Sequence, residues 1–203
     1  MRMVLKRLFC QQVVYNKLMF PAVFLDRDGV IIENRADYVR DWSQVEFLPN
    51  SMDALCRLRR AHYKVILITN QSAVGRGLIT LKNAEEINHR LARVIEENGG
   101  RIDAIYMCPH SPEDQCECRK PRSGLLFSAA RDLSLDLGSS WMIGDAWTDL
   151  LAGQNANLRG VILVKTGRGM DQLQQPKPKN LRDYLVSDDL SDALDLIINP
   201  DSA

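Results

Sequence analysis

Charge of one sign is what this chain most clearly lacks, since 26 Lys and Arg residues balance 26 Asp and Glu residues. A formal net charge of zero removes the electrostatic footprint that is typical of nucleic-acid-binding proteins. The chain also lacks an uninterrupted apolar run of 18 residues, so no membrane span is predicted. We therefore expect neither nucleic acid nor membrane among its partners, and any anion site has to come from locally placed side chains.

A disulfide framework is a second feature that we do not expect. The five cysteines are odd in number, and three of them crowd between Cys108 and Cys118. This clustering indicates a metal site in a reducing compartment, and hence a cytoplasmic protein. Internal repeats and low-complexity tracts are missing as well, and 203 residues suit one large domain with an ample core.

Residues 1–20 differ in composition from the rest of the chain, because they hold four basic residues and no acidic one. A secretory signal would need a continuous apolar core and a small-residue cleavage site, and neither is clear here. A transit peptide and a true start at Met19 are alternatives to a loose tail. The prediction is a tail over residues 1–20 that lies outside the fold, followed by a single domain over residues 21–200.

Apolar runs of strand length alternate with amphipathic stretches of helix length from Pro21 onward. The strand candidates are residues 22–25, 65–68, 102–107, 141–143, 161–164 and 184–186. The helix candidates are residues 50–61, 80–99, 123–135, 148–156 and 191–198, while residues 172–180 are expected to form a surface loop. This alternation predicts an α/β fold of Rossmann-like type, with right-handed βαβ units, a mainly parallel sheet and helices on both of its faces.

Polar clusters follow three of the predicted strands directly, namely Asp26-Arg27-Asp28, Thr69-Asn70 and Gly144-Asp145. Because the carboxyl ends of parallel strands meet at one edge of a sheet, we expect these clusters to converge on one crevice. A carboxylate there can attack phosphorus as a nucleophile, and a neighbouring carboxylate can act as an acid and base. A surface Asp-Gly turn at the end of an edge strand is the simpler alternative for the first cluster.

A loop rich in metal-ligating residues follows the third predicted strand. Cys108 and His110 form one close pair, and Cys116 and Cys118 form another after five intervening residues. Four ligands of the Cys₃His type fill the tetrahedral positions of Zn²⁺, which is typical of a structural ion. Residues 111–115 have nothing apolar to bury, so zinc would supply the order of the loop. A reduced loop without metal is the alternative.

Four motifs, in this order along the chain, resemble those of the haloacid dehalogenase (HAD) superfamily. They are Asp26-x-Asp28-Gly29, Thr69-Asn70, Lys120-Pro121 and Gly144-Asp145-x-x-x-Asp149. The resemblance covers residues 21 to about 167 and implies a Mg²⁺-dependent phosphatase. It implies that Asp26 is the nucleophile that becomes an aspartyl-phosphate and that Asp28 is the general acid and base. Thr69 would hydrogen-bond a phosphoryl oxygen, and Lys120 would balance charge on the nucleophile and the transferred group.

The same resemblance implies the magnesium ligands. They would be the side chains of Asp26 and Asp145 and the backbone carbonyl of Asp28, with Asp149 supporting them from behind or binding the ion through a water molecule. Charge complementation at a helix N-terminus is a structural role for Asp149 that is compatible with this one. For Lys120, the alternative is an ordinary solvated surface lysine.

The cysteine-histidine loop is followed at once by Arg119-Lys120-Pro121, and this combination narrows the resemblance to one family within the superfamily. Together with Asp-Arg-Asp-Gly and Thr-Asn-Gln-Ser, it is similar to the zinc-containing, capless family of D-glycero-D-manno-heptose-1,7-bisphosphate 7-phosphatases and histidinol-phosphate phosphatases. Loops replace a large cap domain in that family, and the 43 positions from Asp26 to Thr69 leave no room for a cap. The implied substrate is a small phosphorylated sugar, first a heptose bisphosphate of cell-envelope sugar synthesis. Histidinol phosphate or another small phosphomonoester is the alternative.

The resemblance also implies a set of substrate contacts. These are Asn34, Asn70, Gln71, Ser72, Arg119 and Lys120. Zinc would hold Arg119 over the pocket, where its planar fork suits a second phosphate. Ala146 departs from the pattern because many members carry a substrate-contacting lysine there, and Arg35 or Arg76 would compensate. We expect a monomer; a non-catalytic zinc-stabilised binding module is the remaining alternative, against which the presence of both Asp26 and Asp28 argues.

Overall fold

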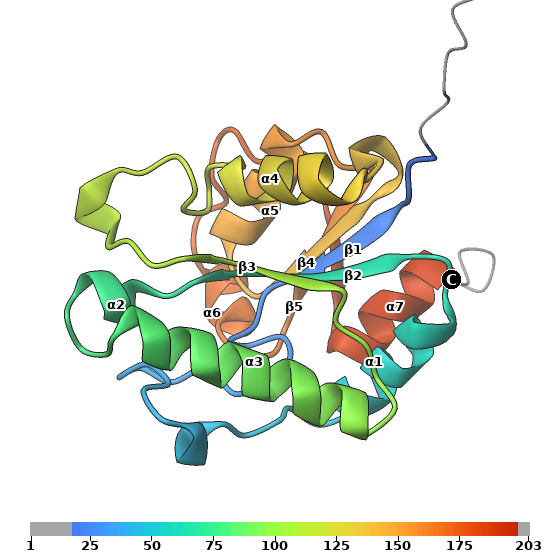
Figure 1. Ribbon diagram of the computed structural model, residues 1–203. Helices are drawn as coiled ribbons and strands as arrows, with labels where there is room; N and C mark the ends of the chain where they lie inside the picture. The colour runs from blue at the N-terminus through green and yellow to red at the C-terminus, as the bar shows by residue number, and fades with distance from the viewer. Residues whose placement is uncertain (1–17, 199–203) are drawn as a thin grey trace, which may run out of the picture.

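The computed structural model describes residues 18–198 of the chain (Figure 1). The predicted tail over residues 1–20 therefore falls mostly outside the described residues, and the division into a tail and one domain stays a prediction. Phe20 already pairs with the fold, because its N–H donates to the Ser134 carbonyl at 3.0 Å and its own carbonyl accepts from the Asp136 N–H at 2.9 Å.

Six strands form one sheet through the centre of the molecule (Figure 1). They are β1 (Ala22–Leu25), β2 (Lys64–Asn70), β3 (Ala104–Cys108), β4 (Trp141–Gly144), β5 (Gly160–Val164) and β6 (Leu185–Ser187). Their order is β3-β2-β1-β4-β5-β6, and every neighbouring pair is parallel. This order reverses between β1 and β4, which is where open α/β sheets bind their ligands. The predicted Rossmann-like parallel sheet is confirmed.

Helices cover both faces of this sheet, as expected. They are α1 (Ser51–Arg60), α2 (Ser72–Gly75), α3 (Leu81–Glu97), α4 (Gly124–Leu133), α5 (Trp147–Asn155), α6 (Gly169–Gln174) and α7 (Leu190–Ile198). In Figure 1, α4 and α5 lie on one face, and α1, α3 and α7 lie on the other. None of the described helices combines the length and the apolarity needed to cross a membrane.

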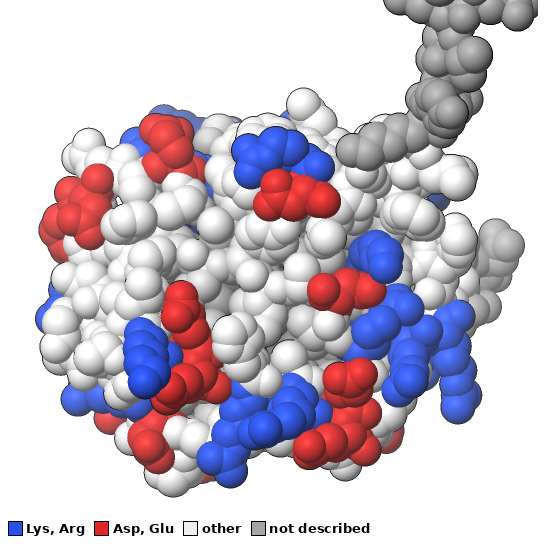
Figure 2. All heavy atoms as spheres, viewed as in Figure 1, with Lys and Arg blue, Asp and Glu red and all other residues white. Residues whose placement is uncertain are grey.

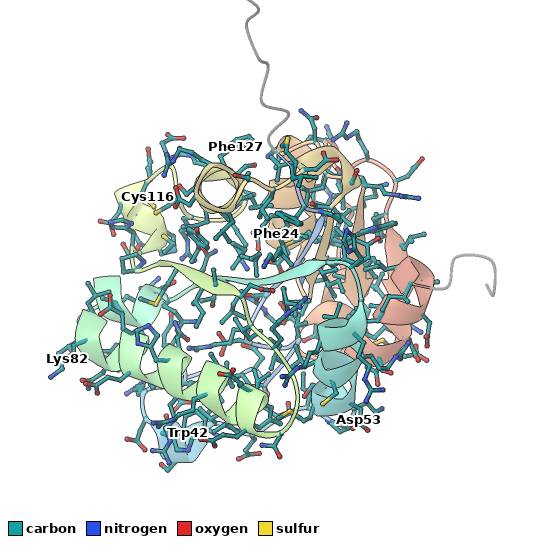
Figure 3. The ribbon with its side chains drawn as sticks, turned by 45° about the vertical axis from the view of Figure 1, so that its right-hand side comes forward. Phe24, Trp42, Asp53, Lys82, Cys116 and Phe127 are labelled. Atoms are coloured by element: carbon teal, nitrogen blue, oxygen red, sulfur yellow. The ribbon has the colours of Figure 1, made fainter. Side chains whose placement is uncertain are left out.

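The core consists of two apolar layers, one on each face of the sheet. Val23 and Leu25 of β1 belong to the layer under α1, α3 and α7, whereas Ala22 and Phe24 belong to the layer under α4 and α5. Successive strand side chains point to opposite faces, and a strand that is buried on both faces therefore reads as a continuous apolar run. Figure 3 shows Phe24 on the side of the sheet that α4 covers. This double burial holds the carboxyl end of β1 rigidly in place.

Two short helices differ from the sequence-based expectation. Helix α2 follows β2 directly and was not predicted, and α6 extends over residues 172–174, which were predicted as loop. That part of the loop prediction is wrong because Gln172 has a tertiary partner: its Oε1 accepts the Trp147 N–H at 2.9 Å. Within the described residues no separate cap domain is present; between β1 and α1 the chain forms only loops and the short 3₁₀ helix η1 (Trp42–Gln44).

Candidate active site

The carboxyl ends of several strands open into one cavity of about 560 Å³ beside the β1–β4 reversal. Residues from the ends of β1 and β2, from the segment after the cysteine-histidine loop and from the start of α5 line it. Among them are Asp26, Asp28, Asn34, Asn70, Gln71, Ser72, Arg119, Lys120 and Asp149. The structure thus brings every predicted substrate contact to one cavity together with both aspartates of the first motif.

Lys120 is the central cation of this cavity. Its Nζ lies 2.8 Å from Asp26 Oδ1 and 2.6 Å from Asp149 Oδ1, and it donates to the Ile68 carbonyl at 2.8 Å. The lysine is only 2% exposed, so the alternative of a solvated surface lysine is wrong. The side chain of Asn70 makes two hydrogen bonds to the backbone of Lys120: Asn70 Oδ1 accepts from the Lys120 N–H, and Asn70 Nδ2 donates to the Lys120 carbonyl. The end of β2 therefore determines where Lys120 lies.

The buried charges in this cavity perturb one another. Burial raises the pKa of Asp26 to about 6, although the charge of Lys120 acts in the opposite direction. Burial likewise raises the pKa values of Asp145 and Asp149. For Lys120, burial lowers the pKa, but Asp149 and Asp26 overcome this effect and raise it. One lysine shared by two carboxylates leaves the negative charge only partly compensated, and this is an environment that attracts a further cation.

Asp145 has a cationic partner that the sequence did not reveal. The carboxylate is fully buried, and Arg168 contacts both of its oxygens: Arg168 Nη2 lies 2.9 Å from Oδ1, and Arg168 Nε lies 3.2 Å from Oδ2. The Arg168 N–H also donates to Oδ2 at 2.9 Å. Lys165 directly follows β5, and Arg168 comes three residues later. Its position shortly after the end of a fourth strand was the signal from which a role at the site could have been predicted.

Two glycines allow the backbone to approach Asp145 closely. Gly29 has a φ of 85° and Gly167 has a φ of 56°, which are left-handed values that favour glycine. A Cβ at either position would overlap Asp145 Oδ2. Thr166 Oγ1 ties the two loops together by donating to the Gly29 carbonyl at 2.6 Å. The Asp-Gly turn is therefore part of a buried site, and the alternative of a surface turn is wrong.

The carboxylates of this site suit a divalent cation. Oxygen atoms of Asp26, Asp145 and Asp149 all lie within 4.8 Å of one another. Carboxylate oxygens are the donors that Mg²⁺ prefers, usually one or two of them together with a substrate phosphate. Asp149 already uses one oxygen for Lys120 and the other for the Ala146 N–H at the start of α5, 3.1 Å away. The helix-capping role and the supporting role that the sequence left open for Asp149 are thus compatible in the structure.

Asp28 and Thr69 are connected by the side chain of Gln71. Gln71 Nε2 donates to Asp28 Oδ2 at 2.9 Å and to Thr69 Oγ1 at 2.8 Å. Arg27, which stands between the two aspartates of the first motif, is 1% exposed and also contacts Asp28. Sequence reasoning did not assign a role to Arg27, although a charged residue inside a strand-ending motif was a signal of burial in a paired state.

The cysteine-histidine loop brings its four predicted ligands together. The three sulfur atoms lie 3.2–3.5 Å from one another, and His110 Nδ1 lies 3.3 Å from Cys118 Sγ and 3.6 Å from Cys108 Sγ. None of the described cysteines is in a disulfide. A tetrahedron with such edges has its centre about 2.1 Å from each corner, close to the metal–ligand distances of zinc. Figure 3 shows Cys116 on the same side of the sheet as α4.

This loop also touches the cavity. Arg119 Nη1 donates to the His110 carbonyl at 3.3 Å, and Arg76 Nη2 lies 3.6 Å from Glu113 Oε1. The Gly75 N–H of α2 donates to the Pro109 carbonyl at 2.8 Å. A change in the order of the loop would therefore reach two of the arginines that line the cavity.

Known proteins share this fold and these motifs. A HAD-hydrolase-like family model matches residues 117–193, which include Lys120, Asp145 and Asp149. Fold and site together define a phosphatase of the HAD superfamily, a phosphoric monoester hydrolase. The chain is 38% identical to a D-glycero-β-D-manno-heptose-1,7-bisphosphate 7-phosphatase of Pseudomonas aeruginosa, over 83% of this chain and 93% of the relative. It belongs to that family, as the resemblance in its sequence implied.

Further relatives carry the same kind of name. A Helicobacter pylori protein with the same name is 37% identical over 87% of this chain and 96% of its own. The solved structure of D,D-heptose 1,7-bisphosphate phosphatase from B. bronchiseptica, complexed with magnesium and phosphate, matches with a TM-score of 0.81 at 35% identity. That match covers 89% of this chain and 99% of the B. bronchiseptica chain.

Proposed function

We propose that the chain removes the 7-phosphate of D-glycero-D-manno-heptose 1,7-bisphosphate and leaves the 1-phosphate, with Mg²⁺ bound in the active site. The names of its relatives support the substrate. The observation that carries the chemistry is the buried lysine shared between two carboxylates: Lys120 Nζ is 2.8 Å from Asp26 and 2.6 Å from Asp149. A nucleophile with its countercharge already in place suits attack on an anionic ester.

The first step transfers the phosphoryl group to Asp26. One carboxylate oxygen of Asp26 attacks phosphorus while the bond from phosphorus to the sugar oxygen breaks. Asp28 gives its proton to the departing sugar oxygen, so the sugar leaves as an alcohol. Lys120 balances charge on the attacking carboxylate and the moving phosphoryl group, and Thr69 Oγ1 donates to a phosphoryl oxygen.

The second step regenerates the enzyme. Asp28, now ionised, takes a proton from a water molecule whose oxygen attacks the phosphorus of the aspartyl-phosphate. The bond between phosphorus and Asp26 breaks, and inorganic phosphate leaves. Asp28 is then protonated again, and both aspartates are in their starting states.

The charge of the cavity supports a role for magnesium. Asp26 and Asp145 would hold Mg²⁺ with their side chains and Asp28 with its backbone carbonyl, while Asp149 would steady the arrangement. When bound, Mg²⁺ offsets the repulsion between the nucleophile and the anionic substrate. Arg168 donates to both oxygens of Asp145 and fixes the orientation of this carboxylate.

A bisphosphate substrate needs a second anion site, and four arginines line the cavity: Arg35, Arg76, Arg119 and Arg168. Arg119 is the proposed partner of the distant phosphate, because a planar guanidinium makes paired hydrogen bonds to phosphate. Ala146, buried beside Asp145, brings no charge to the site. The neighbouring arginines compensate for the lysine that many relatives carry at this position.

The second proposed metal is a structural zinc ion. The ligand set Cys108, His110, Cys116 and Cys118 and its near-tetrahedral spacing support it. Free thiols that bind zinc also favour a reducing compartment, and we extend the proposal to the cytoplasm on this ground. We propose that the chain works as a monomer, which light scattering during gel filtration tests directly.

Side-by-side measurement of kcat/KM tests the proposed substrate. Heptose bisphosphate, histidinol phosphate and fructose bisphosphate are compared with and without Mg²⁺, and phosphorus NMR identifies which phosphate is lost. We expect the highest kcat/KM for heptose bisphosphate, loss of its 7-phosphate, and no turnover after magnesium is removed. A preference for histidinol phosphate would reject the substrate and keep the phosphatase, whereas no hydrolysis of any ester would reject both.

A further inference from the structure

A buried clamp surrounds the second aspartate of the first motif. Arg27 makes four hydrogen bonds from three nitrogens: Nε and Nη2 donate to the two oxygens of Asp28 at 3.2 and 3.0 Å, and Nη2 also donates to Gln71 Oε1 at 3.0 Å. The fourth bond runs from Nη1 to Asn88 Oδ1 at 2.7 Å. Asn88 lies on α3, 61 positions away in the chain, and is 2% exposed. The guanidinium is therefore held from behind by a helix that does not line the cavity.

The donors are divided unequally between the two oxygens of Asp28. Oδ2 accepts from Arg27 Nε and from Gln71 Nε2, whereas Oδ1 accepts from Arg27 Nη2 alone. A carboxylate oxygen has two lone-pair sites in its plane, so Oδ2 is filled and Oδ1 keeps one site free. The Asp28 side chain is 19% exposed, in contrast to its 1% exposed partner. The free site on Oδ1 is therefore the one that is available to a ligand in the cavity.

We propose that Arg27 and Asn88 are positioning residues, which turn Asp28 so that it transfers its proton through Oδ1. The inference rests on the proposed phosphatase activity. In the first step the proton on Oδ1 moves to the leaving sugar oxygen as the phosphorus–oxygen bond breaks. In the second step Oδ1 takes a proton from the attacking water. Asn88 acts only through Arg27, because it restricts the guanidinium to the plane in which both Asp28 oxygens are contacted.

A purely structural role for the clamp makes a different prediction. Buried arginine–asparagine contacts also join α3 to β1, and their loss would destabilise the protein and reduce every activity alike. Loss of positioning slows phosphoryl transfer only from esters whose leaving group needs the proton, whereas hydrolysis of the aspartyl-phosphate, which all substrates share, is slowed equally for all. An alkyl leaving group such as a sugar needs protonation, whereas p-nitrophenolate leaves without it. General acid catalysis contributes about 10²–10⁴-fold in rate.

Asn88→Leu is the main variant, because it removes the acceptor for Arg27 and keeps a side chain that branches at the same carbon. We expect the pre-steady-state rate of leaving-group release to fall about 30-fold or more with the sugar phosphate and less than about 3-fold with p-nitrophenyl phosphate, with substrate affinity little changed for both. Asn88→Asp keeps an acceptor oxygen and should restore most of the sugar phosphate activity. Arg27→Lys, which keeps the charge and loses the fork, is the second variant and should repeat the substrate-dependent loss if Asn88→Leu does not fold.

Leu91→Ala is the matched control, since Leu91 is equally buried on α3 and its side chain makes no polar contact. It should lower the unfolding midpoint and leave the ratio of the two activities unchanged. Equal losses on both substrates in the Asn88 and Arg27 variants, or no loss on either, would overturn the proposal. A wild-type protein that hydrolyses neither ester would instead reject the proposed function, so the two failures are distinguishable.

Discussion

The carboxylate pocket and the cysteine-histidine loop lie side by side but owe their order to different forces. Asp26, Lys120, Asp145 and Asp149 are at most 4% exposed, and Asp26 and Asp145 stand at the ends of strands that are packed on both faces. Residues 111–115 between the two ligand pairs form only one 3₁₀ turn, and four of these five residues are exposed. The pocket is positioned by the core, whereas the loop is held by its four metal-ligating side chains and by a few hydrogen bonds and ion pairs, such as those of Arg119 and Arg76.

The pocket also differs from the molecular surface in how its charged side chains are paired. Inside the pocket Asp26 and Asp149 share the buried Lys120, and the fully buried Asp145 pairs with Arg168, whose side chain is half exposed. On the molecular surface basic and acidic side chains lie interspersed on the face shown in Figure 2, without a field of one sign. Ion pairs of that exposed kind contribute little to stability, while buried ones are costly to break. We therefore expect mutations in the two regions to have distinct signatures.

Removal of zinc is expected to give the largest effect, because binding to such ligand sets contributes on the order of 10 kcal/mol in finger peptides. Cys118→Ser should increase hydrogen exchange over residues 109–119 and leave the sheet protected. KM should rise more than kcat falls, since Arg119 is bound to the loop through the His110 carbonyl. Cys56→Ser is the control, as this thiol contacts the Asn98 carbonyl elsewhere. An unchanged KM in protein that is verified to be zinc-free would contradict the link between loop and pocket.

Asp26→Asn tests the pocket without disturbing the loop. Asparagine cannot attack phosphorus, so we expect kcat to fall at least about 10⁴-fold, which corresponds to about 5 kcal/mol of activation free energy. The amide oxygen can still accept from Lys120, and near pH 4, where the Asp26 carboxyl of the folded wild type is largely protonated, the unfolding midpoint should change little. Steady-state kinetics and thermal unfolding measure both. Retention of full activity would exclude Asp26 as the nucleophile.

Lys120→Met tests whether the buried ion pairs of the pocket contribute more to the free energy of unfolding than an ion pair on the surface does. It leaves Asp26 and Asp149 without their shared cation, and breaking a buried pair from one side costs about 3–5 kcal/mol. Lys165→Met is the control, because the pair of Lys165 with Asp188 is largely exposed and contributes at most about 1 kcal/mol. Urea unfolding gives both free energies. Equal losses would mean that Lys120 is not a structural partner of the carboxylates.

Stability of the magnesium-free protein should depend on pH through Asp26. Its pKa is about 6 in the folded state, against 3.8 for an unperturbed aspartate, so the folded state binds more protons between these values. Stability from this group is therefore present below about pH 4 and is lost as pH rises through 6, by about 2–3 kcal/mol. Asp26→Asn lacks this titration, and its stability relative to wild type should increase from pH 4 to pH 7. A constant difference over that range would contradict the raised pKa.

Arg119→Lys should give the smallest effect. Loss of the planar fork is expected to raise KM for the bisphosphate about 10-fold, equivalent to about 1.4 kcal/mol, with kcat nearly unchanged. A monophosphate substrate should be affected less, because it has no second phosphate to bind. Arg131→Lys, on the exposed surface of α4, should change neither constant. Equal effects on bisphosphate and monophosphate would remove Arg119 from the second phosphate site.

Local patterns were sufficient to predict the sheet, most of its helices and the close approach of Asp26 and Asp145. The failures share a cause. Helix α6 extends into a predicted loop, because Gln172 accepts a hydrogen bond from the Trp147 N–H. The role of Arg168 was not predicted, because it depends on contact with Asp145, 23 positions away. The burial of Lys120 likewise depends on Asn70, 50 positions distant. Partners so far apart leave no periodic signal in the sequence.

The sequence by itself determined the α/β alternation, the three polar clusters at strand ends and the four ligands of the loop. These follow from the periodicity of apolar residues and from the chemistry of residues that are close together in the chain. Only the tertiary structure decided which cation faces which carboxylate, that Asn88 supports Arg27, and that Asp28 keeps one oxygen site free. Such pairings depend on the register of the parallel strands and on helix packing. Both are set by the burial of the whole core at once and not by any single segment.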